Sequence, residues 1–143
     1  MDDIEYCVTT WGVDRPLLQQ VRRKVFVVEQ QVPESEEWDD DDPFSLHVLA
    51  TRNREPVGTG RMTPAGKIGR MAVLSEVRGR GVGSTILRLL VDEALHRGLL
   101  ELRLNAQVPA IPFYERHGFA AEGPVFMEAG IPHRSMRRML GRR

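Results

Sequence analysis

The chain of 143 residues contains a single cysteine, Cys7, and therefore cannot form an internal disulfide. Cys7 lies in an apolar stretch, which favours a buried, unreactive thiol over a catalytic nucleophile. The first residues, among them Asp2 and Asp3, lack the basic and apolar regions of a secretory signal peptide. No apolar run approaches the ~20 residues of a membrane span. We therefore expect a cytoplasmic protein.

The chain also lacks net charge, because 20 Lys and Arg residues balance 20 Asp and Glu residues. Composition alone thus points to neither nucleic acid nor a charged membrane surface as a partner. A basic cluster near the end has no aromatic stacking platform beside it, so we do not expect nucleic-acid binding. The cluster consists of Arg134, Arg137, Arg138, Arg142 and Arg143. No spacing of histidines, Cys7 and acids is typical of a metal site, and we expect no metal.

Residues 67–97 organise the chain, because they predict a strand, a glycine-rich loop and a helix. The loop is Arg78-Gly79-Arg80-Gly81-Val82-Gly83, and it leads directly into Ser84 and Thr85. Its glycines let a ligand approach the backbone, and free N–H groups at a helix N-terminus favour phosphate. Apolar residues at four-residue spacing indicate the helix, which Gly98 ends. These residues are Val82, Ile86, Leu90 and Ala94.

Two familiar phosphate-binding motifs do not fit this loop. A P-loop requires a lysine after its last glycine, but Ser84 follows Gly83 and no lysine occurs after Lys67. In the dinucleotide fingerprint the third glycine comes one position later than Gly83. The acid of that fingerprint also stands at the far end of the next strand, whereas Glu101 lies near the beginning of the strand expected here.

The other elements predict a mixed α/β fold in one domain, residues 1–143. Because a helix separates the strand at 67–73 from the strand at 99–106, these two strands should pair in parallel. Further strands are expected at 4–11, 44–52, 57–63, 119–126 and 133–140, and a short helix at 109–117.

A helix is expected after Asp14, with Pro16 in its first turn and a buried apolar stripe along one face. The stripe consists of Leu17, Val21, Val25 and Val28. The segment 29–42 that follows contains eight acids and no base. It is either a solvated loop or a wall whose negative charge attracts a protonated amine. Calcium is disfavoured, because the glycine and glutamate of a calcium-binding loop are missing.

Arg78, Gly81 and Gly83 follow the pattern of Arg or Gln, two residues, Gly, one residue, and Gly or Ala. The stretch resembles motif A of the GNAT superfamily of acyl-CoA-dependent N-acyltransferases. Residues 113–119, Phe-Tyr-Glu-Arg-His-Gly-Phe, resemble the second GNAT signature. Upstream and C-terminal segments resemble the ElaA-like subgroup, namely Arg23, 25–27, 29–30, 37–39 and 130–133. The resemblance covers nearly the whole chain and implies a mixed sheet of about six to seven strands with flanking helices.

The resemblance implies that acetyl-CoA is the co-substrate. The glycine loop would hold its pyrophosphate, and the backbone around Val73 would bind the pantetheine arm and polarise the thioester carbonyl. Tyr114 would lie near the sulfur as a proton donor. The residues expected to contact the coenzyme are Met71, Ala72, Val73, Arg78, Gly79, Arg80, Gly81, Val82, Gly83, Ser84, Thr85, Asn105 and Tyr114.

The candidates for the general base are Glu29 and His133, because both lie in subgroup-like motifs and either could accept a proton directly or through water. Each could instead be structural. Glu29, Glu37, Glu128 and His133 are the expected contacts of the acceptor, and in the GNAT layout the acidic segment lines the acceptor side. His47, in contrast, is expected to be a packed or half-exposed strand residue.

These features predict an N-acetyltransferase that transfers an acetyl group from acetyl-CoA to a primary amine by direct nucleophilic attack. The alternative is a regulatory module that binds acyl-CoA without catalysis. The acceptor is a small-molecule or peptide amine, and the sequence does not distinguish between these classes. It also leaves the oligomeric state open, with a homodimer as one possibility.

Overall fold

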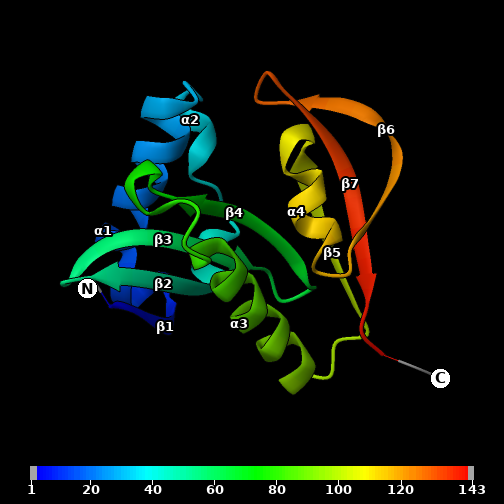
Figure 1. The fold of residues 1–143 in the computed structure, drawn as a ribbon, viewed down its shortest axis with the longest axis horizontal. Helices are drawn as coiled ribbons and strands as arrows, with labels where there is room; N and C mark the ends of the chain where they lie inside the picture. The colour runs from blue at the N-terminus through cyan, green and yellow to red at the C-terminus, as the bar shows by residue number, and fades with distance from the viewer. Residues whose placement is uncertain (1–2, 142–143) are drawn as a thin grey trace.

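The structure is a computed structural model that describes residues 3–141 and contains a seven-stranded sheet with helices on both faces (Figure 1). The strand order is β1-β2-β3-β4-β5-β7-β6, and only β4 and β5 pair in parallel. The strands are β1 (Ile4–Thr10), β2 (Leu46–Arg52), β3 (Glu55–Met62), β4 (Lys67–Val73), β5 (Glu101–Gln107), β6 (Ala120–Glu128) and β7 (Ile131–Met139). The helices are α1 (Trp11–Arg22), α2 (Glu34–Glu37), α3 (Val82–His96) and α4 (Ile111–Glu115). The mixed fold, the strand pattern and the parallel pair expected from the sequence are thereby confirmed.

The two faces of β3 explain how helices cover the sheet. Gly58 and Gly60 face α3, and a Cβ atom at Gly58 would lie 3.1 Å from both Ile86 and Val82. The missing side chains therefore allow the apolar stripe of α3 to lie close against the strand. Arg61 follows Gly60 in the strand and therefore points to the opposite face of the sheet. Helix α1 packs on that face, and Arg22 of α1 is buried there. The helices α1 and α3 thus sandwich the β1–β4 half of the sheet.

The first helix differs from its prediction at both ends. It begins at Trp11 with Thr10 as its N-cap, and Asp14 keeps a non-helical backbone (φ −122°, ψ 23°) just before Pro16. After Arg22 the chain continues as a π-helical segment, η1 (Arg23–Glu29). A π-helical turn contains more than 3.6 residues, so residues after Arg22 no longer point to the face on which an α-helix would place them. Val28 is consequently 68% exposed and not buried as expected.

The remaining expected elements are close to their predicted bounds. The hairpin of β2 and β3 turns at Asn53 and Arg54, which both have positive φ (50° and 68°), as a two-residue hairpin turn requires.

Cys7, expected to be buried, is exposed, because β1 is an edge strand of the sheet. Partial burial and the nearby Asp14 carboxylate raise the pKa of the Cys7 thiol, which disfavours the reactive thiolate.

The sheet splits between β4 and β5. These strands pair only at Lys67 with Arg103 and at Ile68 with Leu104. On the other side of β4, the register with β3 shifts between Thr59 and Arg61. β4 has one residue more than β3 in this stretch, which contains Arg70 with a φ of 51°. This bulge bends β4, so its second half diverges from β5.

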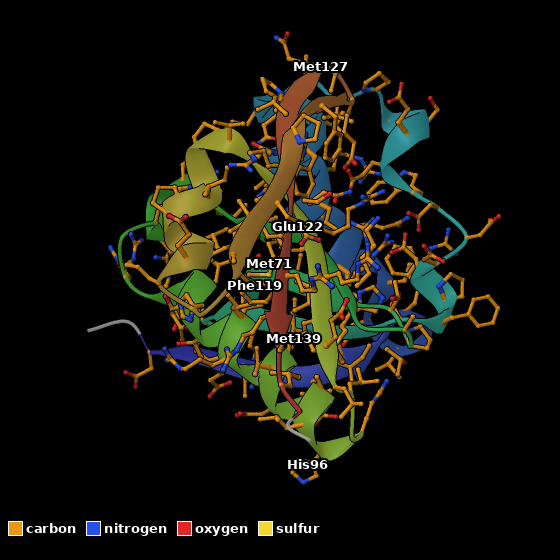
Figure 2. All side chains as sticks on the ribbon, turned by 90° about the vertical axis from the view of Figure 1, so that its right-hand side faces the viewer. Met71, His96, Phe119, Glu122, Met127 and Met139 are labelled. Carbon is orange, nitrogen blue, oxygen red and sulfur yellow. The ribbon has the colours of Figure 1, made fainter. Side chains whose placement is uncertain are left out.

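The strands β5, β7 and β6 form the second half of the molecule, with α4 packed against it (Figure 1). Figure 2 faces this half and shows Met127 at the tip of the β6–β7 hairpin and Met139 at the other end of β7, with His96 below it at the end of α3. Arg134, Arg137 and Arg138 of the basic cluster form local contacts with Gly123, Glu122 and His117, while Arg142 and Arg143 lie outside the described residues. Within residues 3–141, no helix is long and apolar enough to cross a membrane.

Candidate functional site

A cavity of about 510 Å³ occupies the split between β4 and β5. Residues from η1 and α2 line it on one side of the sheet, and Ala110 and Tyr114 line it on the other. The cavity brings together nine of the site residues expected from the sequence. These are Glu37, Met71, Ala72, Val73, Arg78, Asn105, Tyr114, Glu128 and His133.

The glycine loop lies next to this cavity and begins α3. Gly81 is the N-cap residue, with φ 78° and ψ 12°, and no side chain caps the helix. Gly79 also has positive φ, and a Cβ at either glycine would meet nothing within 4 Å. Thr85 N–H is the first amide with a partner in the helix, the Gly81 carbonyl at 3.0 Å. The bare amides that precede it, up to Ser84, and the positive end of the helix dipole suit a phosphate group.

The side chains that follow the loop are used within the protein. Ser84 Oγ lies 3.0 Å from His117 Nε2, and Thr85 Oγ1 donates to the Gly81 carbonyl. Burial and the three arginines near His117 lower its pKa, which favours a neutral imidazole beside Ser84. Ser84 therefore offers an anion its backbone amide more readily than its hydroxyl. No local pattern indicated the contact between Ser84 and His117, which lie 33 residues apart.

The backbone of Val73 faces the split in the sheet. Leu74 N–H donates to Val57 O at 2.9 Å, which makes Val73 and Gly58 a non-hydrogen-bonded pair of the antiparallel ladder. In such a pair the N–H and C=O of both residues point away from the partner strand. The Val73 amide is consequently directed toward β5, with which β4 no longer pairs at this level. A free amide in this position can stabilise negative charge on a carbonyl oxygen.

Tyr114 lines the cavity from α4 and is 8% exposed. Its ring packs edge-on against Phe113 and Phe119. Burial raises the pKa of the Tyr114 phenol above its ordinary value, because an apolar environment disfavours the charged phenolate. The hydroxyl therefore keeps its proton through the neutral range and can act as a donor.

His133 lines the cavity with an imidazole whose tautomer is set by the backbone. Its Nδ1 lies 2.6 Å from the carbonyl oxygen of Ile131, which can only accept, so Nδ1 carries the proton. In the neutral ring Nε2 is then unprotonated, and it lies 3.9 Å from Glu128 Oε2. Asn105 Nδ2 donates to Glu128 Oε1 at 3.1 Å and fixes that carboxylate. Three residues from β5, β6 and β7 thus form one polar cluster.

Glu29, the other candidate base, is held by the arginine that precedes the glycine loop. Arg78 Nη1 and Nη2 each lie 2.7 Å from a different oxygen of Glu29, and Arg78 Nε donates to Val73 O at 2.9 Å. These hydrogen bonds lower the pKa of the Glu29 carboxyl. As long as the pair persists, Glu29 is a weaker base than an ordinary carboxylate.

The acidic segment 29–42 does not carry the uncompensated charge of minus eight that its sequence predicts. Five of its eight acids lie within 3.3 Å of arginine nitrogens. These five are Glu29, Glu34, Glu37, Asp39 and Asp42. Of the other three, Asp41 lies 4.0 Å from Arg61, and Glu36 and Asp40 are exposed. The arginines that neutralise the cavity wall come from other elements, which a local charge count does not include.

Arg61 and Arg70 provide much of this compensation and were missed by the sequence analysis. Arg61 binds both oxygens of Asp39, at 2.7 and 2.9 Å, and Arg70 adds a contact to Asp39 at 3.1 Å. Burial opposes ionisation of Asp39, but these arginines outweigh it and lower its pKa to about 2. For Arg61 the available signal was a single charged residue inside the strand expected at 57–63, because a buried cation needs an acidic partner.

Arg22 connects the wall to the protein interior. It is 1% exposed, binds Glu37 at 2.8 Å and Asp42 at 2.7 Å, and lies over the rings of Trp11 and Trp38. Glu37, expected to contact the acceptor, is therefore engaged by Arg22 and, at 3.3 Å, by Arg70. Burial outweighs the attraction of both arginines and raises the pKa of Glu37.

A hydrogen bond between two side-chain amides also links distant residues that line the cavity. Gln107 Nε2, at the end of β5, donates to Gln30 Oε1 at 3.0 Å, and both residues line the cavity. Their positions lie 77 residues apart in sequence, so no local pattern could have indicated the contact.

Comparison with known proteins agrees with this geometry. Residues 14–140 match the acetyltransferase (GNAT) domain family. The chain is 41% identical over 120 residues to the uncharacterized N-acetyltransferase YjcF of Bacillus subtilis, covering 81% of this chain and 86% of YjcF. It is 33% identical over 129 residues to protein ElaA of Escherichia coli, covering 85% and 84% of the two chains.

Solved structures give the same result. The crystal structure of Escherichia coli ElaA matches with a TM-score of 0.84 and 30% identity over 94% of this chain and 99% of ElaA. An acyl-CoA N-acyltransferase from Pseudomonas aeruginosa matches with a TM-score of 0.86 and 29% identity over 95% and 99%. The chain therefore belongs to the GNAT acetyltransferase family and, within it, to the proteins similar to ElaA.

Proposed function

We propose that the protein transfers an acetyl group from acetyl-CoA to a primary amine by direct attack of the amine on the thioester. The observation that carries this proposal is the convergence of three groups on one cavity. They are the backbone amide of Val73, the protonated hydroxyl of Tyr114 and the imidazole of His133, whose Nδ1–H bond to Ile131 leaves Nε2 as the accepting nitrogen of the neutral ring. Acyl transfer to an amine needs these three capabilities: stabilisation of a carbonyl oxygen, an acid and a base.

The donor side of the site fits coenzyme A. The open space at Gly79 and Gly81 leaves room for a diphosphate against the amides of the loop, and Arg78 and Arg80 add positive charge. The backbone from Met71 to Val73 lies along the cavity and is available to the pantetheine arm. When bound, acetyl-CoA supplies an acetyl group activated as a thioester.

The chain's own groups then divide the chemistry among them. The Val73 N–H donates to the carbonyl oxygen as negative charge develops on it. His133 Nε2 accepts the proton that the attacking amine must lose, while the Ile131 carbonyl keeps the imidazole in the productive tautomer. Tyr114 donates its proton to the departing sulfur.

The acceptor side of the site favours an ammonium group at Glu128. Asn105 orients this carboxylate, and its distance of 3.9 Å from His133 Nε2 leaves room for a bridging water or an amine nitrogen. Glu37 does not bind the acceptor directly. It pairs with Arg22 and Arg70, and these three residues together shape one side of the cavity. The acceptor is a small-molecule or peptide amine.

A thiol-release assay with acetyl-CoA and a broad panel of amines tests the proposal. We expect amine-dependent release of coenzyme A that falls by roughly 10²-fold or more in His133→Gln, as for loss of a general base. Slow release that no amine stimulates would contradict transfer and favour a non-catalytic acyl-CoA-binding module.

Substitution of Gly81 tests the donor site separately. In Gly81→Val, a side chain would stand where the diphosphate approaches, and we expect calorimetric titration to detect no binding of coenzyme A. Gly98→Val is the matched control, because Gly98 also has positive φ (72°) and open space but lies beyond the opposite end of α3. Both variants suffer the same backbone strain. Equal affinity in the two variants would contradict the placement of the diphosphate.

A further inference from the structure

Arg78 engages all three of its side-chain nitrogens in the arrangement described above. Nη1 and Nη2 donate to Glu29, and Nε donates to the carbonyl of Val73. The guanidinium thus joins three parts of the site: the end of η1, the end of β4 and the start of the glycine loop. All three nitrogens therefore contact protein oxygens, and none is left to bind an anion held by the amides of Gly79 to Ser84.

This arrangement occupies groups that the donor site requires. The carbonyl of Val73 faces the split, where an extended pantetheine arm would pair with β4, but Arg78 Nε already uses it. The positive charge of Arg78 is neutralised by Glu29 at the same time. Binding of an anionic diphosphate beside Gly81 therefore competes with Glu29 for the same guanidinium.

The Glu29–Arg78 pair is easily exchanged. Its side chains are 45% and 43% exposed, and exposed ion pairs contribute little to stability because water and salt screen them. Glu29 thus holds Arg78 in one position, but breaking this pair costs little free energy. A diphosphate, with two negative charges and additional amide donors around it, is a stronger partner than one carboxylate.

We propose that Arg78 is a latch operated by the acyl donor: it exchanges Glu29 and the Val73 carbonyl for the diphosphate of acyl-CoA, and so releases Glu29 to join Glu128 in binding the ammonium group of the acceptor. The proposal rests on the function proposed above. Arg78, which holds the Glu29 carboxylate at 2.7 Å, lines the cavity, and so does the next residue, Gln30, so the freed carboxylate lies at the border of the cavity. The donor then binds first, and its arrival completes the acceptor site.

The latch predicts opposite effects of Glu29→Gln on the two substrates. Coenzyme A should bind roughly two- to five-fold more tightly to this variant, because Arg78 no longer gives up an ion pair. The KM for the amine at saturating acetyl-CoA should rise roughly five- to tenfold, because a charge-assisted contact is lost. A merely structural role of Glu29 would weaken both, since a disturbed η1 borders both sides of the site.

Glu34→Gln is the matched control. Glu34 belongs to the same segment and forms a similar exposed pair with Arg23 at 2.8 Å, with side chains 50% and 45% exposed. Its partner Arg23, unlike Arg78, does not line the cavity. Its affinity for coenzyme A and its amine KM should equal those of the wild type. In the double variant Glu29→Gln/Arg78→Gln, coenzyme A affinity should equal that of Arg78→Gln alone, because the competition acts only through Arg78.

Isothermal titration with coenzyme A and steady-state kinetics with an amine from the panel provide the measurements. Tighter coenzyme A binding together with a higher amine KM in Glu29→Gln supports the latch. Unchanged or weaker coenzyme A binding, or an unchanged amine KM, overturns it and leaves the function proposed above intact. Failure of the wild type to bind coenzyme A would overturn that function, and the latch with it.

A spectroscopic measurement follows Glu29 directly. Carboxyl-carbon NMR of the labelled protein should show a lowered pKa of Glu29 without ligand, caused by the hydrogen bonds from Arg78. Saturation with coenzyme A should raise this pKa, because Arg78 leaves and phosphate charge arrives. The same pKa in both samples would overturn the exchange of partners.

Discussion

Substitution of Arg22 by methionine tests the charge network that forms the acceptor wall. Methionine approximates the length of the arginine stem but removes three hydrogen bonds to side-chain oxygens of Glu37 and Asp42, and one to the Glu37 carbonyl. Arg22 is 1% exposed, so water cannot replace these contacts without opening the packing between Trp11 and Trp38. The variant leaves two buried carboxylates with less compensation.

The magnitude follows from what each carboxylate retains. Removal of one partner of a buried ion pair typically costs about 3–5 kcal/mol. Asp42 still has Arg61 at 2.8 Å, and Glu37 still has Arg70 at 3.3 Å. Glu37 can also take up a proton, since its pKa is already raised. We therefore expect a loss of about 3 kcal/mol in the free energy of unfolding, the low end of that range.

Urea unfolding followed by tryptophan fluorescence is a direct assay, because the two tryptophans of the chain are the rings that flank Arg22. The loss should be smaller at pH 5 than at pH 8, because Glu37 is more readily protonated at the lower pH. Arg23→Met is the control: Arg23 forms an exposed pair with Glu34, and its loss should cost less than about 1 kcal/mol. Equal losses in the two variants would refute the buried network.

Three further predictions concern the acid, the pH dependence and the fold. Tyr114→Phe should lower kcat by roughly 10-fold or more, with little change in the KM for acetyl-CoA, and steady-state rates equal to the wild type would refute the role of the phenol as an acid. Because the pKa of Asp39 is lowered from 3.8 to about 2, its contribution to stability is present above the unfolded value and is lost as the pH falls through about 2. Asp39→Asn should flatten this acid limb of unfolding free energy against pH, and an unchanged limb would contradict the pairing with Arg61. Arg54→Gly should raise the unfolding free energy by about 0.5–1 kcal/mol, because Arg54 has a φ of 68° in the hairpin turn, and it should leave acetyl transfer unchanged. A loss of stability would contradict the strain assigned to that turn.

Local pattern was sufficient for the centre of the molecule. The strand Lys67–Val73 has the bounds that its sequence predicts, and the helix begins at Val82 as its apolar spacing indicates. Both elements take their structure from their own residues: β-forming apolar side chains in the strand, and glycines followed by an apolar stripe in the helix. The resemblance of the loop and of residues 113–119 to GNAT motifs then indicated the family, which the comparisons confirm.

The rest depended on contacts between distant segments. The π-helical end of α1 changed which residues of its stripe are buried, and the position of β1 at the sheet edge exposed Cys7. The charge of the acidic segment could not be judged locally, because Arg61 and Arg70 come from later strands. The bulge at Arg70 likewise follows from the register of β4 against β3, which no periodicity reveals.

The most direct test of the central claim is a crystal structure of the protein soaked with acetyl-CoA. The account predicts that the diphosphate lies within hydrogen-bonding distance of the loop amides from Gly79 to Ser84, and that the thioester lies in the split beside Val73 and Tyr114. Acetyl-CoA bound elsewhere, or a split in which β4 and β5 have closed to pair along their full length, would contradict it.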